Sequence, residues 1–95
     1  IAQVDFARFT AHSGQSLHRL THKECAVLQL LLEKSGKAVS RDEILSRAWA
    51  PDEFPTERTV DNFILRLRRL VEQDPANPQT IRSIRGVGYL LENNE

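Results

Sequence analysis

Residues 56–73 read TERTVDNFILRLRRLVEQ, and this stretch predicts a single amphipathic helix. Apolar side chains recur at spacings of three and four residues, which places them on one helix face: Val60, Phe63, Ile64, Leu67, Leu70 and Val71. At about 100° per residue the opposite face holds Arg58, Asn62, Leu65 and Arg69, flanked by Asp61, Arg66 and Arg68. Thr56 can cap the start, and Asp74-Pro75 ends the helix near Gln73. We therefore expect a helix that is buried on one side and positively charged on the other.

Two shorter helices are predicted before it. Their starts share the capping box, in which a Ser or Thr hydroxyl and a Glu carboxylate bind unpaired backbone amides: Thr21-His22-Lys23-Glu24 and Ser40-Arg41-Asp42-Glu43. The first helix covers residues 21–34 and ends at Ser35-Gly36, because glycine readily adopts the left-handed conformation. The second is short and ends at Pro51, and Ala38-Val39 forms a brief extended link between the two.

Short strands are predicted at both ends of the chain. Apolar residues separated by small or polar ones, with a turn signal at 13–15, indicate two to four antiparallel strands within residues 1–20. Residues 80–85 and 89–91 are predicted to form a hairpin around the tight turn Gly86-Val87-Gly88. We interpret both glycines as positions that need permissive backbone angles rather than as a phosphate-binding loop, because no helix follows them.

The charge of the chain is balanced overall but not locally. The 95 residues suffice for one domain and not for two, and 13 basic side chains match 13 acidic ones. Residues 50–57 contain three acids and no base, whereas residues 58–69 contain four arginines against Asp61. A local patch rather than the net charge decides which partner binds, so the balance does not exclude a polyanionic partner.

Other features argue against several classes of site. The single cysteine, Cys25, cannot form an intramolecular disulfide, and with no visible signal peptide or membrane-length apolar run we expect a cytoplasmic location. His18, His22 and Cys25, with His12 farther away, are split across a strand end and a helix start, so we expect no metal site. No nucleophile stands beside a base, and we expect no catalytic residues, cofactor or small-molecule substrate.

The order of these elements points to a nucleic-acid partner. A short second helix that leads through a loop into a basic third helix is typical of a helix-turn-helix, and a following hairpin is typical of a winged helix. Such a helix fits the major groove, where each base pair presents its own donor and acceptor pattern. An arginine near the hairpin tip can reach the adjacent minor groove. The arrangement indicates binding to double-stranded DNA.

Six motifs resemble the OmpR/PhoB-type effector domain of bacterial response regulators: Thr21-His22-Lys23-Glu24 with its leucine-rich helix, Ser40-Arg41-Asp42-Glu43-Ile44-Leu45, Trp49, Arg58-Thr59-Val60-Asp61, Leu67-Arg68 and Ile84-Arg85-Gly86-Val87-Gly88-Tyr89. The resemblance covers essentially the whole chain. It implies an α+β fold, a winged helix-turn-helix that occupies residues 1–95 as one domain. Its parts are an antiparallel sheet of about four short strands at 1–20, a three-helix core at 21–73 and a wing hairpin at 79–91.

The resemblance also implies a function. It implies sequence-specific promoter binding for transcription regulation, with the protein associated with the bacterial nucleoid when bound. Tandem protomers would occupy direct repeats, and phosphorylation of a receiver domain would control them. The chain begins at Ile1 rather than at a methionine, and we expect that receiver to precede it.

Position by position, the resemblance assigns DNA contacts to residues of this chain. Base contacts are expected from Arg66 and Asp61, and from Asn62 on the same helix face. The resemblance implies phosphate contacts for Arg58, Arg68, Trp49 and Ser83, and we expect a further one from Arg69 on the exposed helix face. Arg85 matches the wing arginine that enters the minor groove. The loop 50–57 matches a segment that touches RNA polymerase in some members, through the candidates Asp52, Glu53 and Phe54.

Several of these residues have two interpretations. Asp61 either contacts a base amino group or orients Arg58 or Arg68. Trp49 packs in the core or an interface, and its indole N–H can also reach a phosphate. Phe63 and Leu65 stand where some members carry polar or basic residues. Phe63 fits the apolar stripe, whereas the outward-facing Leu65 either meets a thymine methyl group or forgoes a phosphate contact.

Two rival hypotheses remain at this level. Winged helices can bind protein partners through the same faces, and the acidic loop would suit a polymerase subunit. Alternatively, the domain binds DNA but is attached to a membrane sensor instead of a receiver.

Overall fold

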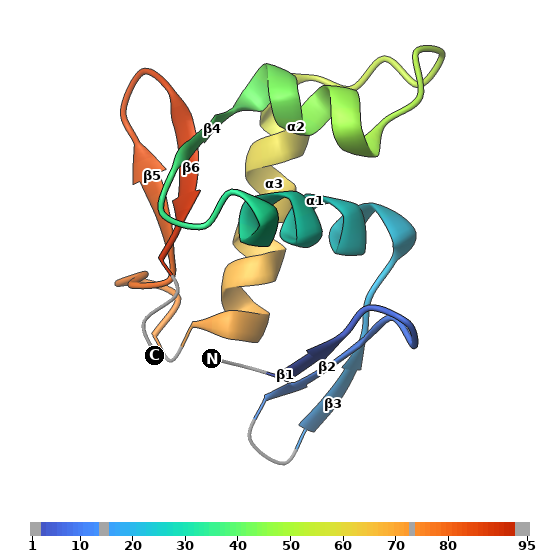
Figure 1. Cartoon of the computed structure of the whole chain (residues 1–95), viewed down its shortest axis with the longest axis vertical. Coiled ribbons are helices and arrows are strands. Elements are labelled where there is room, and N and C mark those ends of the chain that lie inside the picture. The colour runs from blue at the N-terminus through green and yellow to red at the C-terminus, as the bar shows by residue number, and fades with distance from the viewer. Residues whose placement is uncertain (1–2, 14–15, 73, 93–95) are drawn as a thin grey trace.

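The computed structural model describes residues 3–13, 16–72 and 74–92, in which three helices lie between two small antiparallel sheets (Figure 1). The elements follow in this order: β1 (Gln3–Asp5), β2 (Thr10–Ser13), β3 (Ser16–Arg19), α1 (His22–Glu33), β4 (Ala38–Ser40), α2 (Arg41–Ala48), α3 (Glu57–Val71), β5 (Ile81–Ile84) and β6 (Gly88–Leu91). The α+β winged-helix architecture that the sequence predicts is confirmed. None of the helices in these residues combines the length and apolarity needed to cross a bilayer.

The helix starts are set by side-chain caps. At α1 the predicted capping box is complete, since the Thr21 hydroxyl accepts from the Glu24 amide at 3.1 Å and the Glu24 carboxylate accepts from the Thr21 amide at 2.8 Å. At α2 only half of the predicted box forms. The Ser40 hydroxyl accepts from the Glu43 amide at 3.1 Å, but the Glu43 carboxylate pairs with Lys34 Nζ at 2.6 Å. The Glu43 carboxylate is thus bonded to a lysine instead of completing the capping box.

The N-terminal sheet has the order β1-β2-β3 and is a simple meander. Three strands are present in the described residues, where about four were expected. Between β1 and β2 the chain turns instead of forming another strand, because the Asp5 carboxylate accepts from the amides of Ala7 and Arg8 at 3.0 and 3.2 Å. Phe9 at the end of this turn adopts a positive φ of 54°, which a strand does not allow.

The second sheet has the order β4-β6-β5, and β4 is a strand that the sequence analysis missed. Residues 38–39 were expected to be a link, but Ala38–Ser40 pairs antiparallel with β6. Gly86 has a positive φ of 77°, which confirms its predicted role in the turn. The same prediction is wrong for Gly88. An ideal Cβ there would lie 2.1 Å from the Val39 carbonyl oxygen, so glycine is needed for the close approach of β4 and β6.

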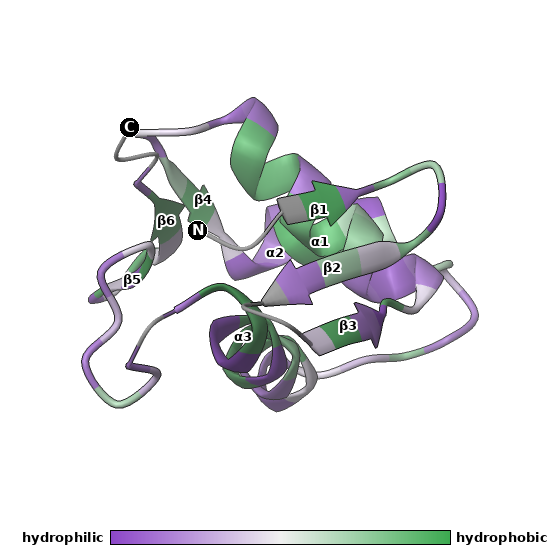
Figure 2. Ribbon diagram, turned by 90° about the horizontal axis from the view of Figure 1, so that it is seen from below, coloured by the Kyte–Doolittle hydropathy of each residue, from purple (hydrophilic) through white to green (hydrophobic). Residues whose placement is uncertain are grey.

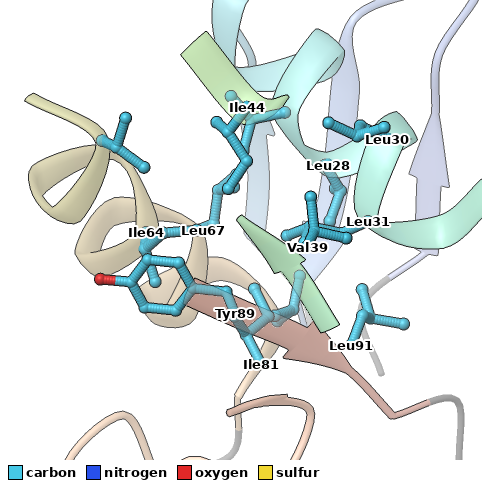
Figure 3. Packing of buried hydrophobic residues seen from close by; sticks show 13 residues of the cluster. Leu28, Leu30, Leu31, Val39, Ile44, Ile64, Leu67, Ile81, Tyr89 and Leu91 are labelled. Carbon is cyan, nitrogen blue, oxygen red and sulfur yellow. The ribbon is translucent and has the colours of Figure 1, made fainter. Parts of the chain in front are cut away.

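The hydrophobic core joins the helices to the second sheet. Figure 3 shows side chains from all three helices and from β4, β5 and β6 converging in it. A smaller cluster of Ala11, Leu20 and Cys25 attaches the N-terminal sheet. Seen nearly end-on in Figure 2, the turns of α3 contain both hydrophobic and hydrophilic residues. The buried side of α3 belongs to the core, and its other side is exposed to solvent.

The connection from α3 to β5 is organised by a buried carboxylate. The helix ends at Val71, slightly before the predicted end near residue 73, and Glu72 caps it. The Glu72 side chain is 8% exposed and accepts from the amides of Gln79, Thr80 and Ile81 at 2.7–3.0 Å. These bonds satisfy backbone groups that the turn would otherwise bury unpaired.

Candidate nucleic-acid interface

The outer face of α3 is open to solvent along its length. Val60, Ile64 and Leu67 are fully buried on the inner face. The side chains that point the other way are exposed: Arg58, Asn62, Leu65, Arg66 and Arg69. Among the described residues no carboxylate forms an ion pair with any of these three arginines. The positive charge of this face is therefore available to an anionic partner, as the sequence predicts.

Arg66 rests on an aromatic platform. Its guanidinium carbon lies 4.8 Å from the centroid of the Phe63 ring, one turn earlier on the same helix. Phe63 in turn packs edge-on against Trp49, with 5.0 Å between the ring centroids. Both rings are half-buried, and Trp49 packs against the main core as its structural interpretation predicts. Phe63 lies at the rim of the helical bundle rather than in the core, where it restricts the directions that Arg66 can take.

Asp61 faces the wing rather than the outer arginines. Its Oδ1 atom accepts from Arg41 Nε at 2.9 Å and from the Tyr89 hydroxyl. These donors replace Arg58 and Arg68, the partners that the second interpretation of Asp61 named. Partial burial disfavours the charged form, but the bonds from Tyr89 and Arg41 outweigh it and hold the pKa of Asp61 below its ordinary value. Burial, followed by the bond to Asp61, raises the pKa of Tyr89.

Two of the predicted phosphate ligands are bonded to each other. Arg68 is half-buried, and its Nε donates to the Ile81 carbonyl oxygen at 3.0 Å. Its Nη2 donates to the Ser83 hydroxyl at 2.9 Å. Arg68 therefore joins α3 to β5, and a substitution at this position would disturb the wing as well as any phosphate contact.

The wing carries exposed cationic side chains. Arg82 lies on β5, and Arg85 lies in the turn that leads to β6; both are exposed. The tip is close in sequence to Tyr89, whose hydroxyl touches the N-terminal half of α3. The wing is therefore bonded to the N-terminal half of α3 through Tyr89.

The loop between α2 and α3 is tethered but presents an aromatic ring. The Glu53 carboxylate pairs with Lys23 Nζ at 2.7 Å and accepts from the Ala50 amide at 2.7 Å. The bond from Lys23, followed by that from Ala50, lowers the pKa of Glu53. Phe54 is 84% exposed and has a positive φ of 48°. Of the three loop candidates, Glu53 thus holds the loop in place, whereas Asp52 and Phe54 face solvent.

We examined the His, Cys, Asp and Glu side chains of the described residues as candidates for a metal or catalytic centre. No group of three or more His, Cys, Asp and Glu side chains there is placed to hold a metal ion. Cys25 is buried, and its burial, followed by the charge of Glu24, raises the pKa of the thiol. A thiol of this kind is a poor nucleophile at neutral pH.

Sequence analysis missed the roles of Arg41 and Tyr89. Both stand in motifs that carry the family resemblance, but nothing in their local patterns links them to Asp61. Asp61 is separated from Arg41 by 20 residues and from Tyr89 by 28 residues. Only the assembled fold brings the three side chains together.

Comparisons with known proteins identify the family to which the chain is similar. Residues 14–91 match the family described as "Transcriptional regulatory protein, C terminal". A probable transcriptional regulator, ycf27 of Galdieria sulphuraria, is 38% identical over 92 residues, which cover 95% of this chain and 36% of that protein. The chain thus spans about a third of the length of this curated relative.

Two solved structures are similar over nearly the whole chain. The response regulator DrrB of Thermotoga maritima, an OmpR/PhoB homolog, superposes with a TM-score of 0.81 at 34% identity, covering 97% of this chain and 42% of DrrB. The DNA-binding domain of Bacillus subtilis CssR superposes with a TM-score of 0.79 at 29% identity, covering 96% of this chain and 99% of that domain.

Proposed function

Since the chain belongs to the family of C-terminal domains of transcriptional regulatory proteins, we propose a specific mode of action for it on promoter DNA. The chain is a DNA-binding domain of the kind that acts as the effector of response regulators. In the proposed mode, α3 lies in the major groove and the wing reaches the adjacent minor groove. The observation that supports it is the exposed face of α3, whose three arginines have no acidic partner among the described residues.

The exposed side chains divide by the part of DNA that they would touch. Arg66 and Asn62 read base edges in the major groove, where an arginine can bind guanine with two hydrogen bonds. Arg58 and Arg69 neutralise phosphates along the groove, assisted by Trp49. Ser83 and Arg68 flank the backbone next to the wing, and Arg85 enters the minor groove.

Leu65 has an apolar role in this mode. It is 51% exposed on the face that would meet DNA. A leucine there can contact the methyl group of a thymine, and it gives no charge to a phosphate. We therefore expect the target to contain a thymine opposite Leu65, and no phosphate contact at that position.

The wider assembly belongs to the same proposal. Two protomers would occupy tandem half-sites, and a receiver domain encoded before residue 1 would control them by phosphorylation. The exposed ring of Phe54, with Asp52 beside it, would contact RNA polymerase. The protein would act in the bacterial cytoplasm, associated with the nucleoid when bound, and would have no enzymatic activity.

Binding assays with sequence variants test the mode of DNA binding. Duplexes selected from a random pool by the chain define its target, and fluorescence anisotropy at two salt concentrations measures its affinity. We expect affinity to fall steeply as salt rises, because neutralised phosphates release counterions. Arg66→Ala should cost about 1–3 kcal/mol on the selected duplex and much less on a scrambled one.

A phosphate contact predicts the opposite pattern. Arg69→Gln should weaken binding to both duplexes alike and reduce the slope of log affinity against log salt by about one. Arg47→Gln is the matched control, because Arg47 pairs with Glu33 away from α3, at 2.6 Å. Equal losses for Arg66→Ala on selected and scrambled DNA would remove its base-reading role.

A further inference from the structure

Polar contacts tie the wing to α3 at two points that lie two turns apart. Near the start of the helix, Asp61 accepts the hydrogen bond of the Tyr89 hydroxyl on β6. Seven residues later, Arg68 donates to the Ile81 carbonyl oxygen and to the Ser83 hydroxyl on β5. Seven residues of helix rise about 10 Å and return to the same face. Two attachments on one helix face fix both the position of the wing and its rotation relative to α3.

Tyr89 is the centre of this arrangement. Its ring is only 5% exposed, and its hydroxyl oxygen points out of the core (Figure 3). The guanidinium carbons of Arg41 and Arg68 lie 5.5 and 5.7 Å from the ring centroid. A hydrogen bond to a charged acceptor is stronger than one between neutral groups, and a cation near an aromatic ring is attracted to it. The contacts therefore hold a side chain of the wing sheet between two arginines and an aspartate.

The close packing of β4 against β6 brings Arg41 to the same place. Val39 lies opposite Tyr89, and Ser40 lies opposite Gly88. Arg41 follows directly in the chain and donates from Nε to Asp61 at 2.9 Å. A side chain at residue 88 would force these strands apart, since its Cβ would meet the Val39 carbonyl oxygen. Thus α2, α3 and the wing meet at one carboxylate.

We propose that Asp61 is a positioning residue that, with Tyr89 and Arg41, holds the wing arginine Arg85 at a fixed place relative to α3. The inference rests on the proposed mode of DNA binding. Arg85 lies four residues before Tyr89, so the hairpin tip follows the position of that ring. When the wing is held in place, Arg85 meets the minor groove without an additional loss of conformational freedom. Asp61 then acts on DNA through Tyr89 and does not read a base.

A double-mutant cycle between the tip and the network tests this role. Affinity for a duplex selected by the wild-type chain is measured for Arg85→Ala alone and in combination with Tyr89→Phe, Asp61→Asn or Arg41→Gln. Tyr89→Phe removes only the hydroxyl of a buried ring. Arg47→Gln serves as the matched control, because it also removes an arginine of α2 from an ion pair. Melting curves confirm that each variant is folded at the assay temperature.

We expect Arg85→Ala to weaken binding about tenfold in the wild-type and Arg47→Gln backgrounds. In the Tyr89→Phe, Asp61→Asn and Arg41→Gln backgrounds the same substitution should cost no more than about threefold, because the wing is no longer held. The base preference of Asp61→Asn in a selection should match that of the wild type. A protein that is merely destabilised but folded would show the full tenfold loss.

Three other outcomes of these measurements would contradict the inference or the proposed function. If Arg85→Ala costs the same factor in every background, the wing is not coupled to Asp61 and the inference is wrong. If Asp61→Asn changes the preference at one base pair while the coupling is absent, Asp61 is a base reader. If the wild-type chain binds no duplex in a salt-dependent way, the proposed function fails, and the inference fails with it.

Discussion

The described residues form two three-stranded antiparallel sheets, and these are attached to the helices in different ways. The N-terminal sheet is a local meander, whose strands β1, β2 and β3 follow one another directly. It joins the helices through the small apolar cluster of Ala11, Leu20 and Cys25, and Val4 of β1 also packs against the main core. The wing sheet combines β4 with two strands from the other end of the chain, and four of its side chains belong to the main core: Val39, Ile81, Tyr89 and Leu91.

The two sheets also differ in the number of hydrogen bonds that attach them to the helices. The wing sheet and the turn that leads into it are bonded to α3 and its cap through Asp61, Arg68 and Glu72. In the N-terminal sheet, the Asp5 carboxylate accepts from two amides of its own turn and pairs with Arg8 of the same turn at 3.8 Å. Apolar burial is not directional, whereas hydrogen bonds fix an orientation. The sheet whose hairpin carries the exposed Arg82 and Arg85 is therefore the one whose orientation relative to α3 is fixed by hydrogen bonds.

The largest effect is expected from Gly88→Ala in the wing sheet. The new Cβ would lie 2.1 Å from the Val39 carbonyl oxygen and 3.0 Å from the Ser40 Cα, so β4 and β6 must separate. We expect the free energy of unfolding, measured with urea, to fall by about 3 kcal/mol or more. Gly86→Ala is the control: nothing lies within 4 Å of its Cβ, and its positive φ should cost about 1 kcal/mol. Similar losses would show that the close approach is not limiting.

The next largest difference is expected between Glu72 and Asp5, whose carboxylates each accept from more than one backbone amide. Glu72→Ala leaves three amides without their acceptor at a position that is 8% exposed, and we expect a loss of about 2–3 kcal/mol in thermal or urea unfolding. Asp5→Ala removes an acceptor from two amides that water can reach, and it should cost about 0.5 kcal/mol. If Asp5→Ala were the more destabilising substitution, the hydrogen bonds of the wing sheet would not be the stronger attachment.

Acid should weaken the link between the wing and α3. The pKa of Asp61 is lower in the folded chain than in the unfolded one. Its ionised form therefore stabilises the fold above about pH 4, and this contribution is lost as the pH falls through the folded pKa. Asp61→Asn should lower the free energy of unfolding by about 1 kcal/mol at pH 7 and by less at pH 3. A difference from wild type that grows on acidification would contradict the sign of the shift.

The smallest effect is expected on the outer face of the N-terminal sheet. Leu17 is 58% exposed on β3, opposite His12 of β2. Leu17→Ser should change the free energy of unfolding by less than about 0.5 kcal/mol. A loss above about 1 kcal/mol in urea unfolding would show that this face is covered in solution, and the two sheets would then be more alike than the comparison states.

Local patterns were enough to predict most of the elements. The periodicity of residues 56–73 predicted α3 and its two faces, because a helix places residues three and four apart on one side. The hydroxyl caps at Thr21 and Thr56 were predictable because each bond spans only three residues. The strand at Ala38–Ser40 was not, because three residues are too few to show an alternation.

Part of the candidate site was predictable because it depends on contacts between residues that are close in the sequence. Exposure of Arg58, Arg66 and Arg69 follows from the helix period alone. The stacking of Arg66 on Phe63 is a contact between residues three apart, but Trp49, which supports the ring, comes from another element. At Ser40 only one of the two capping-box bonds forms, and the Glu43 carboxylate pairs with Lys34 instead. No local motif predicts the position of Lys34.

The sequence by itself therefore determined which segments form helices and a hairpin, and which face of α3 carries arginines, because these depend on interactions within a few residues. Only the tertiary structure decided that Asp61 bonds to Arg41 and Tyr89 and that Gly88 is needed where β4 and β6 approach closely. It also decided that the Glu72 carboxylate binds the backbone amides before β5. These contacts join residues that are far apart in the sequence, and the packing of the core decides which of them meet. Contacts over such separations produce no regular spacing of residue types from which they could be predicted.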